Sequence, residues 1–400
     1  MSVLHALQTR AAPFVALRHD LHRHPELGLK EFRTSELLAQ QLQSWGYTVT
    51  RGLATTGLVA QLQRGKGVKR LGLRADMDAL PIHEVNVFEH RSVHEGVMHA
   101  CGHDGHTAML MAAAQYIAQE VEYSGTLNLI FQPAEEHPGG AKIMIEEGLF
   151  ERFPCDAIFA AHNMPGVPAG QLVFIEGPAM ASSDDVTITL TGVGGHGAMP
   201  HRAQDPIVAA AAIVMTLQTI VSRNVDPQHT AVITVGSLVA GQANNVIPAS
   251  ARLELSVRSL DREVRDLLQE RITQLVTAQA QSLGVLAQID YKRDYPVLVN
   301  TAAETELARQ VGTELLGAER VTRQGRALTG SEDFAVMLEH CPGSYFMIGN
   351  GAGESTGEGT GDSAVAHACM VHNPGYDFND DILPVGAAFW ALLTQRFLKD

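Results

Sequence analysis

The sequence predicts an α/β protein with an open sheet, interrupted by a smaller inserted domain. Strand and helix signals alternate through residues 35–166, which is typical of a sheet covered by helices. The order then changes to strand, helix, strand, strand, helix, strand, and afterwards helix and strand signals resume. We therefore expect one domain built from residues 1–182 and 298–400, and an inserted domain of residues 183–297.

The composition is that of an ordinary globular protein, and it limits the possible partners. The chain has 400 residues, of which 45% are hydrophobic and 18% charged, with a formal net charge of −15. No Lys/Arg-rich block is present, which argues against nucleic acid or an anionic membrane as a partner. With these two classes of partner disfavoured, we expect the partner to be a small molecule. The 4 cysteines are widely spaced without a CxxC pair, so we expect no disulfide framework.

Targeting and membrane signals are weak. The N-terminal stretch lacks an apolar run long enough for a signal peptide. The most apolar helix candidate, residues 206–221, is interrupted by Thr216 and Gln218 and falls short of a membrane span. We therefore expect a cytoplasmic protein.

The first domain shows short apolar strands that stop at charged residues or proline, and helices with amphipathic spacing. The expected strands are residues 70–81, 126–133 and 156–166, and the expected helices are residues 35–47, 105–120 and 139–150. In open α/β sheets, ligands bind beyond the carboxyl ends of the strands. Polar residues follow these strands, so we expect them to gather at one edge: Asp76, Asp78, Glu135, Glu136, His162 and Asn163.

The inserted domain is expected to be a split βαβ, or ferredoxin-like, sandwich. The strands are expected at 184–192, 231–241, 251–259 and 285–296, and the helices at 205–224 and 261–284. Asp205 and Asp261 stand where a helix N-cap is needed. An edge strand and a long helix of this domain are plausible dimerisation surfaces, so we expect a homo-oligomer, either a dimer or a tetramer.

The stretch MHACGHDGHTAML, residues 98–110, crowds a thiol, imidazoles and a carboxylate into a few positions. Either it supplies metal ligands, or it is a polar helix start with incidental histidines, in which Asp104 caps the helix. Cys, His and carboxylate together form the ligand set of zinc or a neighbouring first-row metal. The other histidines, among them His19 and His90, are expected to be surface or capping residues, while His22 is expected to be structural.

The chain as a whole resembles the M20 metallopeptidase family. The resemblance is carried by RADMDALP, MHACGHDGHTAML, FQPAEE, AAHN, GGHGAMPH, ANNVIP, TGSEDF and VHNPGYDFNDD, and it extends from HRHPELG to the last helix. Within the family, the motifs are similar to the amidohydrolase branch of hippurate hydrolases, N-acyl amino acid amidohydrolases and auxin-conjugate hydrolases. The resemblance implies a catalytic domain that holds two divalent metal ions, zinc, manganese, cobalt or nickel, with an inserted lid and dimerisation domain.

The resemblance also implies roles for single residues. The metal ligands that it implies are Cys101, His103, Glu136, His162 and His372, with Cys101 bridging the two ions. Glu135 matches the general base, which would take a proton from water and pass it to the leaving amine. Asp78 matches the acidic residue that orients a metal-bound imidazole.

Three residues of the inserted domain are implied to contact the substrate. His196 matches a histidine that reaches the partner subunit's active site and donates to the oxyanion. Asn244 and Arg258 are candidates for binding the substrate carboxylate, and a structural salt bridge is an equal alternative for Arg258.

These roles predict a metal-dependent amidohydrolase that cleaves N-acyl or N-aroyl amino acids, as in hippurate, to a carboxylic acid and a free amino acid. The alternatives are a dipeptidase or carboxypeptidase acting on short peptides, or a catalytically silent relative that binds metal or ligand. The sequence has no obvious acidic anchor for a free ammonium group, which favours acylated substrates. The Gly-rich, acidic stretch 351–368 is expected to shape a lid or to restrict access of the substrate.

Overall fold

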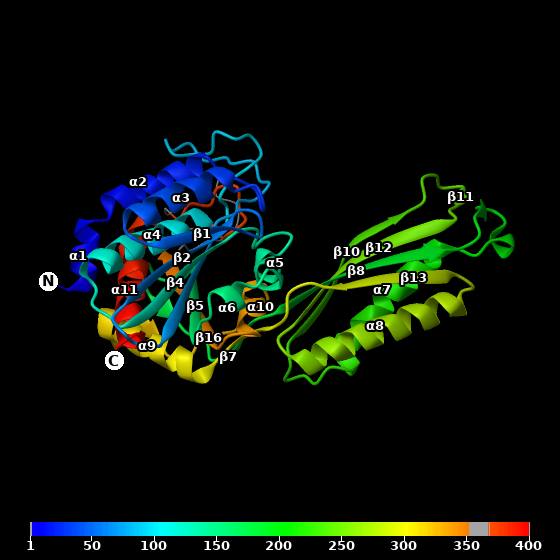
Figure 1. The fold of residues 1–400 in the computed structure, drawn as a ribbon. Coiled ribbons are helices and arrows are strands. Elements are labelled where there is room, and N and C mark those ends of the chain that lie inside the picture. The colour runs from blue at the N-terminus through cyan, green and yellow to red at the C-terminus, as the bar shows by residue number, and fades with distance from the viewer. Residues whose placement is uncertain (1, 352–366, 368, 400) are drawn as a thin grey trace. The chain divides into compact units, whose positions relative to one another are not determined.

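The structure is a computed structural model that describes residues 2–351, 367 and 369–399; the stretch 351–368 lies almost wholly outside the described residues. The chain forms two compact units (Figure 1). The larger unit comprises Met1–Gly177, Val299–Arg326 and Val336–Asp400, and the smaller unit comprises Pro178–Leu298 and Ala327–Ala335.

The larger unit is built on a mixed eight-stranded sheet, in the order β1-β2-β4-β3-β5-β16-β6-β15. Its strands are β1 (Thr48–Leu53), β2 (Gly57–Arg64), β3 (Arg70–Asp76), β4 (Gly125–Gln132), β5 (Ala157–Pro165), β6 (Leu172–Val173), β15 (Val321–Thr322) and β16 (Gly343–Gly351). The four central strands β4, β3, β5 and β16 are parallel. They are almost wholly buried, as strands covered on both faces must be.

Helices cover this sheet on both sides. They are α1 (Val3–Thr9), α2 (Ala12–Arg23), α3 (Phe32–Ser44), α4 (His103–Glu120), α5 (Gly140–Glu146), α6 (Leu149–Arg152), α9 (Ala302–Leu316) and α11 (Leu383–Phe397). Figure 1 shows α4 and α11 on one side of the sheet and α5 and α6 on the other. Helices α4 and α11 are apolar around most of their circumference because they lie in the centre of the core.

The register of the central strands sets the position of the polar residues. Asp76 at the end of β3 lies opposite Gln132 at the end of β4. His162 of β5 lies opposite Met347 of β16. Because these strands run in the same direction, their carboxyl ends meet at one edge of the sheet, as expected from the sequence.

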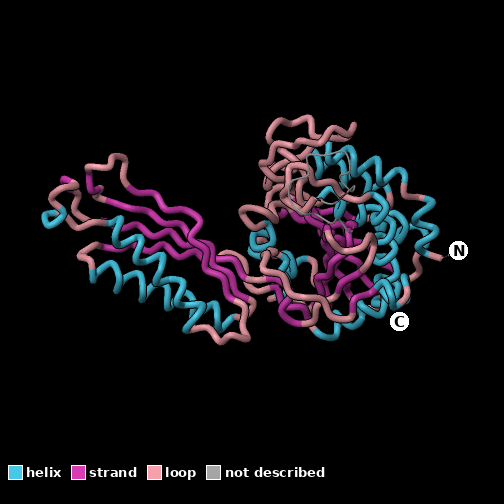
Figure 2. Tube along the Cα trace, turned by 180° about the vertical axis from the view of Figure 1, so that it is seen from behind, coloured by secondary structure: helices cyan, strands magenta, loops and turns pink. Residues whose placement is uncertain are grey.

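The smaller unit contains a four-stranded antiparallel sheet in the order β10-β12-β8-β13. Its elements in chain order are β8 (Ser182–Thr191), α7 (Pro206–Arg223), β10 (Ala231–Ala240), β12 (Ser250–Ser259), α8 (Arg262–Ser282) and β13 (Leu286–Arg293). Figure 2 shows both helices along one face of this sheet. Leu217, Leu253 and Leu268 belong to a separate hydrophobic core between the helices and the strands.

The remaining elements are short. They are β7 (Gly177–Met180), β9 (Gly195–His196), η1 (Pro200–Arg202), β11 (Val246–Ile247), β14 (Leu298–Asn300), η2 (Ala318–Arg320), α10 (Phe334–Leu338) and η3 (Asp380–Ile382). Among them, β9 and β11 form a two-stranded antiparallel ladder that pairs His196 with Val246.

Helix α7 corrects one expectation from the sequence. Its 18 residues are long and apolar enough, by length and composition alone, to cross a membrane. The polar residue Thr216 does not break this helix, since its hydroxyl donates to the carbonyl of Ala212. One face of α7, including Ile213 and Leu217, is buried in the core of the smaller unit, as in a helix that lies on a sheet.

Candidate metal centre

The structure brings the five predicted ligands and Glu135 together at the carboxyl-end edge of the large sheet. Their ligand atoms form three overlapping groups, each with all atoms within 4.8 Å of one another. The groups are Cys101 with His103 and His162, Cys101 with Glu136 and His372, and His103 with Glu135 and Glu136. Cys101 thus belongs to two groups, as a thiolate between two cations would.

The elements deliver these side chains from separate parts of the chain. Cys101 and His103 lie at the start of α4, where Gly102 takes a left-handed conformation with φ of 95°. A side chain at Gly102 would collide with Asn163 and Tyr376, so only glycine fits there. His162 lies on β5, and Glu135 and Glu136 follow β4.

Asp78 orients two residues of the cluster. The Nδ1 of His103 is 2.9 Å from the carbonyl oxygen of Asp78 and 3.2 Å from its Oδ1. The other carboxylate oxygen of Asp78 accepts a hydrogen bond of 2.9 Å from the backbone N–H of Glu136. The Nε2 of His103 is buried without a hydrogen-bond partner. An imidazole held by Nδ1 with an orphaned Nε2 is the geometry of a metal ligand.

His162 is oriented in the same way. Its Nδ1 donates to the carbonyl oxygen of Asn163 at 2.7 Å, which leaves Nε2 3.3 Å from the Sγ of Cys101. His372 has a positive φ of 66°, and its side chain is 51% exposed. Its Nε2 lies 3.0 Å from the Oε1 of Glu136, and its backbone N–H donates to the carbonyl of Ala100.

The charges of the cluster favour a cation. Burial and the nearby carboxylates of Glu136 and Glu135 raise the pKa of the Cys101 thiol well above its ordinary value. Burial alone would lower the pKa of His103, but the charge of Asp76 and the contact with Asp78 raise it to about 10. The protein therefore holds buried negative charge here that positive charge must balance. Together with the orphaned His103 nitrogen, the Cys, His and carboxylate donor set fits zinc or another first-row divalent metal.

Further residues support this cluster: Asp76 and Asn163, which the sequence places at this edge without a specific role, and His106 and Arg74, to which it assigns none. His106 places Nδ1 2.7 Å from Asp76, and its Nε2 accepts from the backbone N–H of Asn163. Both nitrogens of His106 are thus occupied. Asp76 also pairs with the guanidinium of Arg74 at 2.6 Å, so the base of the site is a closed polar network. The sequence signal that could have identified His106 is its position one helical turn after His103, on the same face of the helix.

The three predicted substrate contacts lie in the smaller unit and do not belong to the cluster around Cys101. His196 is exposed in β9, and its Nδ1 accepts from the backbone N–H of Ala198. Asn244 is exposed in the turn before β11. Arg258 of β12 donates to the hydroxyls of Ser256 and Ser331, and among the described residues it has no ion pair. The salt-bridge alternative for Arg258 was therefore wrong.

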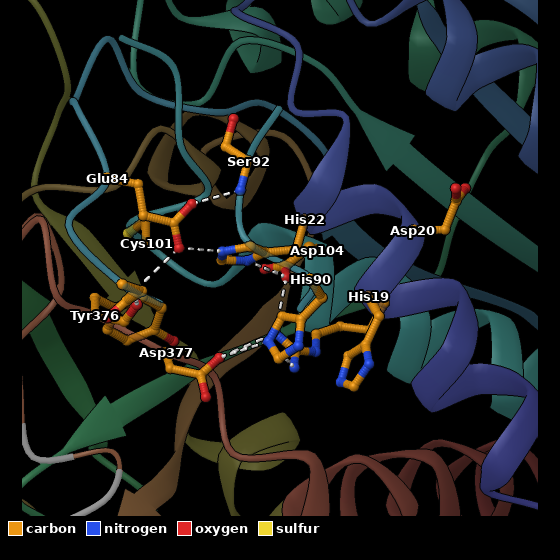
Figure 3. A network of polar contacts seen from close by, with 12 residues as sticks. His19, Asp20, His22, Glu84, His90, Ser92, Cys101, Asp104, Tyr376 and Asp377 are labelled. Atoms are coloured by element: carbon orange, nitrogen blue, oxygen red, sulfur yellow. Dashed lines mark hydrogen bonds and ion pairs between the residues drawn. The ribbon is translucent and has the colours of Figure 1, made fainter. Parts of the chain in front are cut away.

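Two other expectations need correction. Asp104 does not cap α4, since Gly102 occupies the N-cap. Its buried carboxylate pairs with Arg18 and with His22, and Figure 3 shows the contact with His22. His90 is no surface residue, because its Nε2 lies between the guanidinium of Arg18 and the carboxylate of Asp377. The sequence could not reveal these contacts, because the partners are far apart along the chain.

Two known hydrolases are similar in sequence to this chain over almost its whole length. Hippurate hydrolase of Campylobacter jejuni is 42% identical over 386 residues, which cover 96% of this chain and 97% of that protein. IAA-amino acid hydrolase ILR1-like 4 of Arabidopsis thaliana is 36% identical over 391 residues, covering 96% of this chain and 86% of that protein.

The fold, with a large mixed sheet and a small antiparallel sheet, is shared with a solved structure. The YXEP protein of Bacillus subtilis, described as a dinuclear metal binding peptidase from the M20 family, superposes with a TM-score of 0.82 and 30% identity. The match covers 98% of this chain and 99% of that one. Residues 72–396 also match the sequence model of peptidase family M20/M25/M40. The chain therefore belongs to peptidase family M20/M25/M40 and is a hydrolase.

Proposed function

We propose that this protein is a metal-dependent amidohydrolase that cleaves N-acyl or N-aroyl amino acids to a carboxylic acid and a free amino acid. The observation that carries the proposal is the cluster itself: five metal-ligand side chains, Cys101 and His103 among them, lie together, and the carboxylate of Glu135 is part of the same group. The similarity to hippurate hydrolase supports the choice of substrate class.

The cofactor in this proposal is a pair of divalent cations, zinc, manganese, cobalt or nickel. Cys101, His103, Glu136, His162 and His372 would hold them, and Cys101 would be shared. The dinuclear relative in Bacillus subtilis supports a pair rather than a single ion. Bound divalent cations lower the pKa of nearby water towards ~7 and polarise a substrate carbonyl.

The protein's own residues then handle the proton. Glu135 accepts a proton from the attacking water and delivers it to the nitrogen of the scissile amide, so that the amine leaves neutral. The Oε2 of Glu135 is 4.0 Å from the Nε2 of His103, which places the carboxylate beside the ligands. Asp78 keeps the His103 ring and the Glu136 backbone in place while this transfer occurs.

For the smaller unit we propose a ferredoxin-like lid and dimerisation domain in a homo-oligomer, corresponding to residues 183–297 inserted between catalytic segments 1–182 and 298–400. The element order β-α-β-β-α-β and the antiparallel strand order support the ferredoxin-like assignment. In this proposal His196 donates to the oxyanion in the partner subunit, and Asn244 and Arg258 bind the substrate carboxylate. The exposed position of His196 is compatible with this role.

A substrate panel tests the proposed activity. Metal-replete protein would be incubated with N-benzoyl, N-acetyl and indoleacetyl amino acids and with unblocked dipeptides, and the released amine measured by mass spectrometry. We expect cleavage of the acylated compounds that a chelator abolishes. Cleavage of the dipeptides alone would reassign the protein as a peptidase. The absence of any cleavage by protein that holds two metal ions per chain would favour a silent binder.

A further inference from the structure

Arg18 and His22 of α2 belong to a charged network outside the proposed chemistry. Figure 3 shows His22 of this network between Glu84 and Asp104. The two residues lie one helical turn apart, so they share a face of the helix. Both side chains are fully buried. A buried cation needs partners, because moving it out of water without them costs several kcal/mol. The partners of Arg18 and His22 therefore show which segments of the chain this network connects.

Arg18 binds carboxylates from two distant segments. Its Nε and one terminal nitrogen donate to both oxygens of Asp380 at 2.8 and 3.2 Å. The other terminal nitrogen lies 3.2 Å from Asp377 and 3.5 Å from Asp104. The planar fork of a guanidinium suits this division, since it can serve several acceptors in fixed directions.

His22 adds a second contact to the same carboxylate. Its Nδ1 lies 2.9 Å from Oδ2 of Asp104 and its Nε2 lies 3.2 Å from Glu84. Burial alone would lower the pKa of His22, but the charge of Asp104 and the hydrogen bonds to both carboxylates raise it to about 9. The imidazole is therefore a cation near neutral pH, and both ring nitrogens donate.

The carboxylates that α2 binds stand next to metal ligands. Asp104 follows His103 in the first turn of α4. Asp377 and Asp380 lie in the segment 373–380, which follows His372 directly. This segment also reaches Cys101 indirectly: the hydroxyl of Tyr376 donates to the side chain of Asn163, which donates in turn to the carbonyl of Cys101.

We propose that Arg18 and His22 are positioning residues for the metal centre. Arg18 joins Asp104, beside the ligands Cys101 and His103, to the segment 373–380 that follows His372. His22 holds the same carboxylate of Asp104 from the other side and ties it to Glu84. The inference rests on the metal centre of the proposed function. Ligands must be held within about 0.5 Å of their productive positions. Within the part of the chain that the structure describes, the backbone of His372 makes one hydrogen bond to the opposite segment, at Ala100. The carboxylates around Arg18 and His22 supply the rest of the connection.

Two variants test this proposal. His22→Gln removes the charge between Asp104 and Glu84, while Asp380→Asn removes one partner of Arg18 at a side chain that is 30% exposed, so that the fold tolerates it. Arg33→Met is the matched control, because it breaks the exposed ion pair between Arg33 of α3 and Asp20 of α2. Arg18→Lys keeps the charge but loses the fork, so its effect should be intermediate between wild type and His22→Gln.

The measured quantities are the affinity of metal-depleted protein for Co²⁺, by competition with a coloured chelator, and the visible absorption spectrum of the Co²⁺ protein. We expect His22→Gln and Asp380→Asn each to weaken binding about 10- to 100-fold and to alter the spectrum, as loss of an outer partner does. Arg33→Met should match the wild type in both.

The outcomes separate this inference from the proposed function. Folded variants that bind Co²⁺ with wild-type affinity and an unchanged spectrum would overturn the positioning role, while the metal centre would stand. If the network only stabilised the fold, the variants would have a lower unfolding temperature, but their affinity for Co²⁺ and their absorption spectrum would be unchanged. Wild-type protein that binds no Co²⁺ would overturn the metal centre and the inference together.

Discussion

Asp78 contacts two residues of the cluster at once, so its removal should be costly for metal binding. Asp78→Asn keeps the shape of the side chain but replaces one carboxylate oxygen with a donor, which conflicts with the N–H of Glu136 or with the Nδ1 of His103. We expect metal affinity to fall about 10- to 100-fold. Asp290→Asn, a change in β13 of the smaller unit, is the control. Equal affinities of Asp78→Asn and wild type for Zn²⁺ in a chelator competition would contradict the role.

The raised pKa of His22 makes a pH-dependent contribution to stability. The ordinary pKa is 6.5, and in the folded protein it is about 9. A cation with a raised pKa stabilises the fold fully below pH 6.5, and this stabilisation is lost as the pH rises through 9. The groups that face His22 are Arg18, Glu84, His90, His99 and Asp104.

Urea unfolding of the metal-free protein between pH 6 and 10 measures this contribution. We expect wild type to lose on the order of 1–3 kcal/mol more than His22→Gln across this range. His5→Gln, at an exposed position of α1, should follow the wild type. Parallel pH profiles for wild type and His22→Gln would show that the imidazole carries no extra proton in the folded state.

Single residues were predictable where one motif held the partners, and not where the partners were remote. Cys101, His103 and the adjacent glutamates stood out because ligand types recurred at expected strand ends. Asp104 was misread as a possible cap because its partner Arg18 is 86 positions away. The polar character of Asp104 was visible in the sequence, but the identity of its partner depends on packing.

The start of α4 packs tightly against the segment 373–380. A Cβ added at Gly105 would lie 2.3 Å from two atoms of the Phe378 ring, which is buried and cannot rotate away. Gly105→Ala should therefore destabilise the fold by about 1–3 kcal/mol through overpacking.

Gly236→Ala in β10 is the matched control for Gly105→Ala, because the nearest atom would be 3.9 Å from the new Cβ. We expect its stability to stay at or slightly above that of the wild type. Chemical denaturation of both variants measures the difference. Equal denaturation midpoints for Gly105→Ala and wild type would mean that α4 and the segment 373–380 can move apart without loss of stability.

The elements with continuous apolar or amphipathic patterns were predictable. The expected strand 126–133 and helix 105–120 correspond to β4 and α4 within a few residues. Strand β1 was not predicted because it is an edge strand whose residues are mostly exposed or half-buried and partly polar. Strand β2 was not predicted because its apolar, buried part is only the short run Gly57–Ala60, after which polar residues alternate with Leu62. The two-residue strand β9 has no sequence period at all, so only its pairing with β11 defines it.

The two units have separate hydrophobic cores, so metal removal should act on one of them. The two cores are formed by different sets of residues. A metal ion that binds only the folded larger unit stabilises that unit by mass action, and removal of the metal abolishes this stabilisation. We expect calorimetry to show a transition that moves to lower temperature by several degrees with a chelator, and a second transition that does not move. A uniform shift of the whole profile would contradict independent unfolding of the units.

The division of the chain was foreseeable in outline only. The change of pattern after residue 182 reflects a real change of sheet type, from mixed to antiparallel. The short segment Ala327–Ala335 joins the smaller unit although it is remote in sequence from Pro178–Leu298. No periodicity marks such a segment, because long-range contacts and not local pattern assign it.

The most direct test of the account is a paired measurement on Glu135→Gln. The variant keeps the shape of the side chain but cannot accept a proton, so we expect turnover of N-benzoylglycine to fall by about 10²–10⁴-fold while metal content stays at two ions per chain. Glu146→Gln, at an exposed position of α5, should retain full activity. Wild-type turnover by Glu135→Gln with its metal intact would contradict the assignment of Glu135 as the base and with it the proposed reaction.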